Sequence, residues 1–172
     1  VAACHALEAG WQVALMAPTE ILAEQHYLNF KRWFEPLGIQ VAWLSGKQKG
    51  KARTQAEAII RGGLAQLVVG THALFQENVE FARLGLVIID EQHRFGVDQR
   101  LALRNKGAEQ MTPHQLVMTA TPIPRTLAMS AYGDLDTSVI DELPPGRTPI
   151  QTVTIPLDRR EAVLQRISTN CQ

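Results

Sequence analysis

Two adjacent carboxylates follow a continuous apolar run in the segment Leu86–His93, which reads LVIIDEQH. An apolar run of this kind predicts a strand that is covered on both faces of a parallel sheet. Asp90 and Glu91 would then lie at the carboxyl edge of the sheet, where open α/β folds bind their ligands. One carboxylate there could hold Mg²⁺ through water, and the other could activate a water for attack on a phosphate. The alternative is a solvated acidic pair that ends a strand.

Apolar runs alternate with helical segments along most of the chain. The predicted strands are Gln12–Pro18, Gln40–Gly46, Ala65–Thr71, Leu84–Asp90 and His114–Thr121. The predicted helices are Glu20–Phe34, Lys51–Arg61, Gln99–Lys106 and Arg125–Tyr132. Strands joined through helices in this way predict an α/β fold, with a parallel sheet flanked by helices.

The composition narrows the class of protein. Of the 172 residues, 45% are hydrophobic, which suits one domain core and a short piece of a second. Lys plus Arg and Asp plus Glu each number 17, so a uniformly basic coat is excluded and any DNA contact must rest on local charge and backbone amides. No apolar run approaches the ~20 residues that span a membrane. The two cysteines form no metal or disulfide pattern, and we expect a cytoplasmic protein.

Three further motifs fall at predicted strand ends: Ala17–His26 (APTEILAEQH), Gly70–Phe75 (GTHALF) and Thr119–Pro122 (TATP). Each is weak alone, and the first is also a good helix start with Thr19 as its cap. Together with the DEQH tetrad, and in this order, they resemble the motifs of DExH-type superfamily 2 helicases.

Longer segments sharpen this resemblance. Gly46–Arg53 (GKQKGKAR), Asp90–Arg100 (DEQHRFGVDQR) and Met118–Arg147 resemble the bacterial RecG family of branch-migration helicases. The related transcription-repair coupling factors share part of these motifs and are the alternative within the class. The resemblance implies DNA-dependent ATP hydrolysis that remodels branched DNA, such as forks and Holliday junctions, in recombination and repair. It also implies a second motor lobe and a wedge domain as partners in the same protein.

The fold implied is a RecA-like P-loop NTPase lobe over residues 1–145, the first helicase lobe without its P-loop strand. Leu143–Pro149 (LPPGRTP) predicts a rigid linker, so residues 146–172 would hold the linker and the first elements of the second lobe. Within them, the sequence predicts a strand at Thr152–Ile155 and a helix at Arg159–Ser168.

The resemblance also implies roles for single residues. Asp90 would bind Mg²⁺ beside ATP, and Glu91 would deprotonate the attacking water. His93 would relay between the nucleotide and DNA sites, and Gln92 completes the tetrad. The threonines implied to link the γ-phosphate to the DNA contacts are Thr119 and Thr121. The residues implied to contact the DNA backbone are Pro18, Thr19, Gly70, Thr71 and His72. Lys47 is a further candidate, because it opens a basic run directly after a predicted strand end.

Several other polar residues leave alternatives open. For the basic run Lys47–Arg53, a phosphate contact and a solvated loop are equally compatible with the sequence. Arg94 and Arg125 adjoin motifs, where they could contact phosphate or form surface ion pairs. The histidines that belong to no constellation, and to which the sequence assigns no role, are His5, His26 and His114.

No GxxxxGK[ST] phosphate-binding loop occurs in the sequence. The chain starts with a predicted helix tail, Val1–Leu7, that closes at Gly10. We therefore expect a piece of a longer motor, which alone neither hydrolyses ATP nor unwinds DNA. The alternative is a DNA-binding or scaffolding module that functions without the loop, although such a module has no chemical need for DEQH and TATP.

Overall fold

The computed structural model describes residues 1–76, 78–91, 111–120, 136–142, 144–148, 150 and 152–170. The chain divides into two compact units, residues 1–127 and 128–172, and each is described by itself. The domain boundary predicted near residue 145 stays a prediction. The predicted helices Gln99–Lys106 and Arg125–Tyr132 lie outside the described residues.

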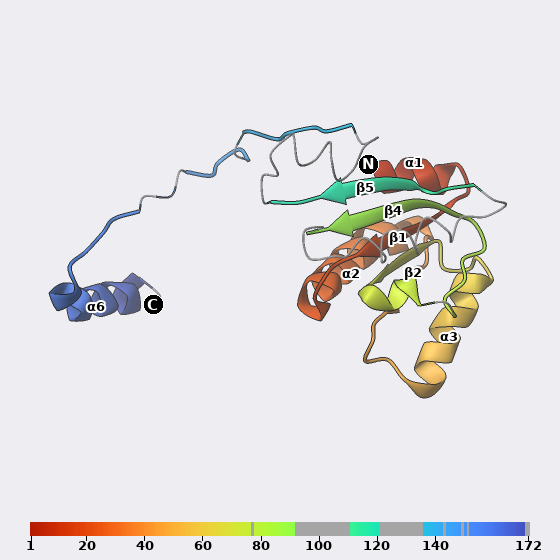
Figure 1. The fold of residues 1–172 in the computed structure, drawn as a ribbon, viewed down its shortest axis with the longest axis horizontal. Coiled ribbons are helices and arrows are strands. Elements are labelled where there is room, and N and C mark those ends of the chain that lie inside the picture. The colour runs from red at the N-terminus through yellow and green to blue at the C-terminus, as the bar shows by residue number, and fades with distance from the viewer. Residues whose placement is uncertain are drawn as a thin grey trace. The chain divides into compact units, whose positions relative to one another are not determined.

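Five parallel strands of the first unit form one sheet in the order β2-β3-β1-β4-β5 (Figure 1). The strands are β1 (Gln12–Met16), β2 (Val41–Leu44), β3 (Leu67–Gly70), β4 (Leu84–Asp90) and β5 (His114–Met118). Each lies within the range predicted from its apolar run. The predicted α/β fold with a parallel sheet is confirmed.

Helices cover both faces of this sheet. They are α1 (Ala2–Glu8), α2 (Glu20–Phe34) and α3 (Gly50–Arg61), with short 3₁₀ turns at η1 (Glu35–Leu37) and η2 (His72–Phe75). Successive residues of a strand point to opposite faces. Val13 therefore packs with Ala3 of α1 and Phe34 of α2, whereas its neighbour Ala14 packs with Ile60 of α3. Burial on both sides explains why the strand sequences are apolar throughout.

The local sequence determines where the helices begin and end. Thr19 caps α2 as predicted, because its Oγ1 accepts a hydrogen bond from the Leu22 N–H at 3.3 Å. Beyond α1, Gly10 adopts a φ of +77°, which is easy only for glycine. The Gly10 N–H donates to the Leu7 carbonyl, and the Trp11 N–H donates to the Ala6 carbonyl. These bonds give hydrogen-bond donors to the last carbonyl groups of α1, and they confirm the helix end predicted at Gly10.

The second unit contains the 3₁₀ turn η5 (Leu157–Arg159) and the helix α6 (Arg160–Asn170). The helix predicted at Arg159–Ser168 is thus confirmed, but the strand predicted at Thr152–Ile155 is wrong. An apolar run forms a strand only where a neighbouring strand pairs with its N–H and C=O groups. No such neighbour exists within the described residues of this unit, and Val153 is 67% exposed. None of the described helices is both long enough and apolar enough to span a membrane.

Candidate nucleotide and nucleic-acid site

The predicted motifs meet at one edge of the sheet because the strands that carry them end in register. One row of aligned residues crosses four strands: Leu44, Gly70, Met16 and Ile89. The next residue of β4, Asp90, is aligned with Met118 of β5. The segments that follow therefore line the carboxyl edge together, where open α/β sheets bind ligands. The strand order puts the predicted nucleotide motifs after β4 and β5, and the predicted DNA motifs after β1 and β3.

The acidic pair lies at the end of β4. Asp90 is the last residue of the strand and is partly buried. Glu91 has a φ of 51°, a conformation that costs energy in any residue but glycine and that clusters at functional sites. Thr119 is exposed and directly follows Met118, the register partner of Asp90. The DEQH and TATP motifs therefore start from adjacent strands.

Asp90 is contacted by a residue to which the sequence assigned no role. Nε2 of His26, on α2, lies 2.7 Å from Oδ2 of Asp90. Because an ionised carboxylate only accepts hydrogen bonds, the imidazole N–H is the donor. The two residues are 64 positions apart in the chain, and the adjacency of β1 and β4 brings them together. One signal could have indicated His26, since it is the last residue of the APTEILAEQH motif.

The residues at this end of the edge fit a magnesium ion that is held by few protein groups. Oδ2 of Asp90 is engaged by His26, whereas Oδ1 makes no hydrogen bond with the described part of the chain. No group of three or more His, Cys, Asp or Glu side chains that could enclose a metal occurs among the described residues. Mg²⁺ needs no such cage, because it keeps several waters and binds one or two carboxylates together with substrate phosphates.

The predicted DNA motif after β1 surrounds the N-terminus of α2. Pro18 and Thr19 are partly exposed there. The Thr19 hydroxyl accepts a hydrogen bond from Leu22 and keeps its own proton to donate. The first N–H groups of a helix have no partner within the helix, which suits them to a phosphate. Thr19 is thus both the cap of α2 and a candidate phosphate ligand.

The motif after β3 is largely buried. A β-carbon on Gly70 would clash with the Leu44 carbonyl oxygen, so glycine is required for β2 and β3 to approach each other. Thr71 is buried, and its Oγ1 has no hydrogen-bond partner within the part of the chain that the structure describes. His72 is exposed, and its ring lies against Gly46. Of the three predicted residues, His72 is the one whose side chain is open to a ligand.

The basic run after β2 contains cations in different environments. Lys47 forms an ion pair with Glu20, the first residue of α2. Their hydrogen bond is the main reason why the pKa of the Glu20 carboxyl is lowered and the pKa of the Lys47 ammonium is raised. Lys49 and Lys51 are exposed and form no ion pair with a described residue.

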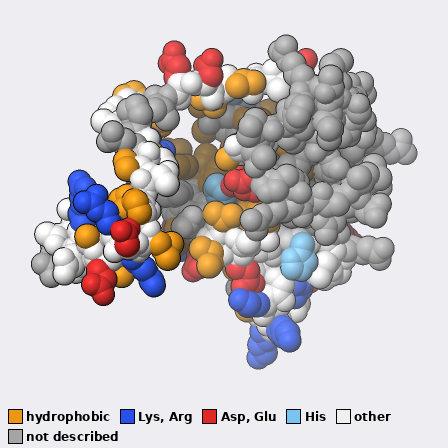
Figure 2. Space-filling view, turned by 60° about the vertical axis from the view of Figure 1, so that its left-hand side comes forward, with side chains coloured by type: hydrophobic (Ala, Val, Ile, Leu, Met, Phe, Trp, Pro, Cys, Tyr) orange, Lys and Arg blue, Asp and Glu red, His pale blue; other side chains and the backbone are white. Residues whose placement is uncertain are grey.

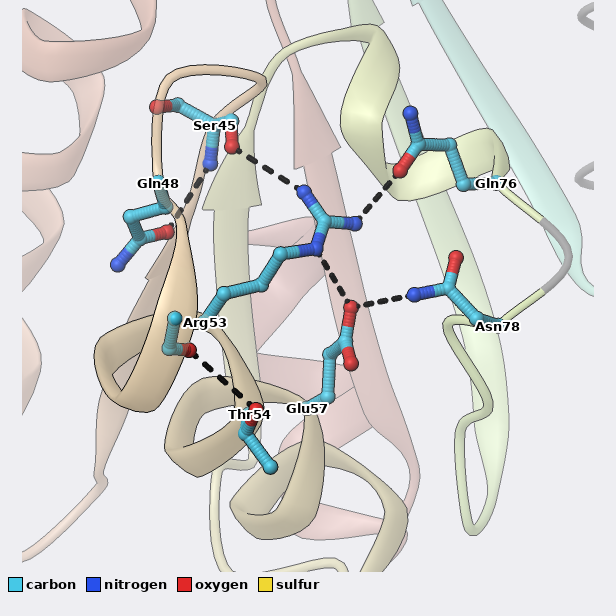
Figure 3. Close-up of polar contacts among 8 residues, drawn as sticks. Ser45, Gln48, Arg53, Thr54, Glu57, Gln76 and Asn78 are labelled. Atoms are coloured by element: carbon cyan, nitrogen blue, oxygen red, sulfur yellow. Dashed lines mark hydrogen bonds and ion pairs between the residues drawn. The ribbon is translucent and has the colours of Figure 1, made fainter.

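Arg53, the last cation of the run, stabilises the fold (Figure 3). Its guanidinium donates to Oε1 of Glu57 at 2.8 Å, to Oε1 of Gln76 at 2.6 Å and to the Ser45 carbonyl at 3.5 Å. Glu57 also accepts a hydrogen bond of 2.6 Å from Asn78. These contacts tie α3 to the loop after β2 and to the segment after η2. Each of the three guanidinium nitrogens makes a hydrogen bond within the chain, and the side chain is only 17% exposed, so Arg53 is a poor candidate for a phosphate contact.

Charges of both signs occur on the face drawn in Figure 2, where Lys and Arg side chains lie close to Asp and Glu side chains. The predicted site residues that lie outside the described residues are Gln92, His93 and Thr121, together with Arg94 and Arg125.

Comparison with known proteins identifies the class. The family model described as DEAD/DEAH box helicase matches residues 1–130. The chain belongs to the DEAD/DEAH box helicase family, whose members use ATP.

Comparison with individual proteins narrows the similarity within this family to RecG. The chain is 66% identical over 172 residues to the ATP-dependent DNA helicase RecG of Escherichia coli O157:H7, a match that covers 99% of this chain and 25% of that protein. The RecG of Thermotoga maritima is 52% identical over 158 residues, which cover 92% of this chain and 20% of that protein. A solved structure of RecG bound to a three-way DNA junction has a TM-score of 0.73 and 47% identity, covering 92% of this chain and 21% of that chain. The resemblance to RecG and the RecA-like helicase fold are confirmed. The chain spans a fifth to a quarter of the length of these curated relatives.

Proposed function

We propose that this chain forms most of the first motor lobe of an ATP-dependent DNA helicase that remodels branched DNA, such as forks and Holliday junctions. The observation that carries the proposal is the alignment of strand ends, which puts an acidic pair and a helix N-terminus suited to phosphate on the same sheet edge. The 66% identity to a protein named RecG, and the junction-bound RecG structure, support DNA as the substrate. The activity is proposed for the complete protein, since the chain spans only a quarter of that relative.

ATP would bind over the carboxyl ends of β4 and β5, between this lobe and a second motor lobe. Asp90 would hold Mg²⁺ through its water shell, and the bound ion would neutralise charge on the phosphates. Glu91 would orient and deprotonate the attacking water. Thr119 would contact the γ-phosphate from the neighbouring strand. His93 and Thr121 keep the relay and linking roles predicted from the sequence.

The DNA backbone would bind at the carboxyl ends of β1, β2 and β3, beside the nucleotide site. The Thr19 hydroxyl and the first N–H groups of α2 would hold one phosphate, with Pro18 shaping the approach. His72 and Lys47 lie on the segments after β3 and β2, where they would contact the same strand of DNA. Contacts of this kind read the backbone and give little preference for sequence.

The rest of the motor is proposed to lie in other parts of the protein. A second lobe would complete the ATP site, and a wedge domain would separate the DNA arms that the motor pulls. The 172 residues alone, which contain no phosphate-binding loop, would neither hydrolyse ATP nor unwind DNA. Because the proposed substrate is bacterial chromosomal DNA, we expect the protein to act in the cytoplasm.

A remodelling assay tests this function. The complete protein is mixed with a three-way junction that carries a labelled strand, and release of the strand is followed with ATP or with a non-hydrolysable ATP analogue. We expect release of the labelled strand with ATP and no release with the non-hydrolysable analogue. If ATP drove the protein along linear duplex as well as along the junction, a duplex translocase like the transcription-repair coupling factors would be favoured. Junction binding with no release would favour a non-catalytic binding module.

A further inference from the structure

The contact between His26 and Asp90 connects the two parts of the sheet edge: the proposed DNA site at the start of α2, and the proposed nucleotide site after β4 and β5. We propose that His26 is a positioning residue that links DNA contact at the N-terminus of α2 to the orientation of the Asp90 carboxylate. The inference rests on the proposed function, because it assigns Asp90 to Mg²⁺ and Thr19 to a DNA phosphate. It gives a role to a histidine outside the DEQH tetrad.

The geometry of the contact suits a positioning role. The 2.7 Å distance between Nε2 of His26 and Oδ2 of Asp90 is that of a strong hydrogen bond. The His26 side chain is 27% exposed and the Asp90 side chain 20%, so neither is free to move as a surface ion pair is. With Oδ2 held, the carboxyl group presents Oδ1 in one direction. Groups that orient a metal ligand in this way commonly control metal affinity.

The helix that carries His26 also carries the predicted DNA contact. Thr19 caps α2, and His26 follows it by about two helical turns, roughly 10 Å along the axis. The helix is continuous from Glu20 to Phe34, so its first turn and His26 belong to one rigid element. A small shift of the first turn toward a bound phosphate would therefore also move the His26 ring. Binding of a phosphate at Thr19 would thus change how Asp90 is held.

Two amide substitutions separate a positioning role from a purely structural one. In His26→Gln, the side-chain N–H₂ group reaches about as far as the imidazole Nε2, and it can still donate to Asp90. In His26→Asn, the same chemical group is one methylene shorter and does not reach. Asn29 is exposed on the same helix and lies outside the Ala17–His26 motif, so Asn29→Ala is the matched control.

The experiment measures the dissociation constant of Mn²⁺ by electron paramagnetic resonance. The complete protein is bound to a non-hydrolysable ATP analogue, with and without forked DNA. We expect DNA to tighten Mn²⁺ binding in the wild type, in His26→Gln and in Asn29→Ala. We expect His26→Asn to bind Mn²⁺ about 10-fold more weakly and to show no effect of DNA.

Thermal unfolding of each variant accompanies the measurement. A folded His26→Asn variant with wild-type Mn²⁺ affinity and a wild-type response to DNA would overturn the inference. If that variant does not fold, the NMR signal of the His26 ring N–H in the wild type decides, because it must shift when DNA is added. An unchanged signal would then overturn the inference. A wild-type protein that binds no Mn²⁺–nucleotide would instead contradict the proposed function itself.

Discussion

Lys47 and Glu20 form an ion pair that joins the loop after β2 to the first residue of α2. The pair stands beside the helix N-terminus that we propose as a DNA phosphate site. An uncompensated Glu20 carboxylate would repel a phosphate there, and Lys47 cancels that charge. Because the Lys47 side chain is 84% exposed, the pair is expected to contribute little to stability. Its main consequence is for the electrostatics of the DNA surface.

The ion pair predicts a titration behaviour for Glu20. Its pKa is lowered in the folded chain, so the contribution of Glu20 to stability is present above the ordinary glutamate pKa and lost as the pH falls through the lowered value. The raised pKa of Lys47 has the opposite sign, because its contribution is lost as the pH rises through the raised value. In a ¹³C NMR titration, Lys47→Met should return the Glu20 pKa toward its ordinary value, and Lys49→Met should not. A Glu20 pKa that stays lowered in Lys47→Met would contradict the pairing.

Lys47 should also contribute to the salt dependence of DNA binding. Each phosphate contact that is lost reduces the slope of log K against log salt by about 1. We therefore expect a slope reduced by about 1 for Lys47→Met. Lys31→Met is the matched control, because Lys31 pairs with Glu35 in the last turn of α2, at the end opposite Thr19. The slopes are obtained from DNA binding measured by fluorescence anisotropy at several salt concentrations. Equal slopes in Lys47→Met and Lys31→Met would show that Lys47 does not contact DNA.

Gly70 should be essential for stability rather than for chemistry. A methyl group in Gly70→Ala would clash with the Leu44 carbonyl oxygen, and we expect a loss of about 1–3 kcal/mol in the free energy of unfolding. Gly62→Ala is the control, because Gly62 has an ordinary φ of −75° and should change stability by less than about 1 kcal/mol. Urea denaturation of the 172-residue chain gives both values. A Gly70→Ala chain as stable as the wild type would disprove the close approach of β2 and β3.

Arg53 should resist replacement by lysine. A lysine ammonium lacks the planar fork that reaches Glu57 and Gln76 together, so Arg53→Lys should lower the free energy of unfolding by about 1–3 kcal/mol. Lys51→Arg, on the exposed face of the same helix, should change it by less than about 0.5 kcal/mol. The DNA salt slope of Arg53→Lys should equal that of the wild type. A reduced slope in a variant of unchanged stability would mean that Arg53 contacts phosphate.

The sheet and its main helices could be predicted from sequence because the signals are local. The strand β1 is buried at every position, which its unbroken apolar sequence indicated. The helix α2 has the predicted bounds, Glu20–Phe34, because Thr19 provides a cap at its start. The apolar run Thr152–Ile155 carries a similar signal but has no neighbouring strand among the described residues of its unit, and no local pattern reveals that.

The side-chain partners at the site could not be predicted, because they come from distant segments. The motif that ends at His26 could mark this residue as functional, but it does not identify Asp90 as the partner, because that contact depends on the order of the strands. In the basic run, Lys47 and Arg53 differ from their neighbours only through partners elsewhere in the chain, Glu20 and Gln76. The motifs therefore predicted which edge of the sheet holds the site, whereas the side-chain contacts at that edge depend on the three-dimensional fold.

The proposed role of Glu91 is to activate water in an ATP-driven motor that DNA stimulates, and the ATPase rate of the complete protein tests this role. The rate is measured without DNA, with linear duplex and with forked DNA, for the wild type and for Glu91→Gln, with nucleotide binding measured in parallel. We expect turnover to be stimulated most by forked DNA and to fall by about 10²–10⁴-fold in Glu91→Gln while ATP still binds. Turnover that survives in Glu91→Gln would rule out Glu91 as the residue that activates water. A wild type whose turnover DNA does not stimulate would rule out a motor that acts on DNA.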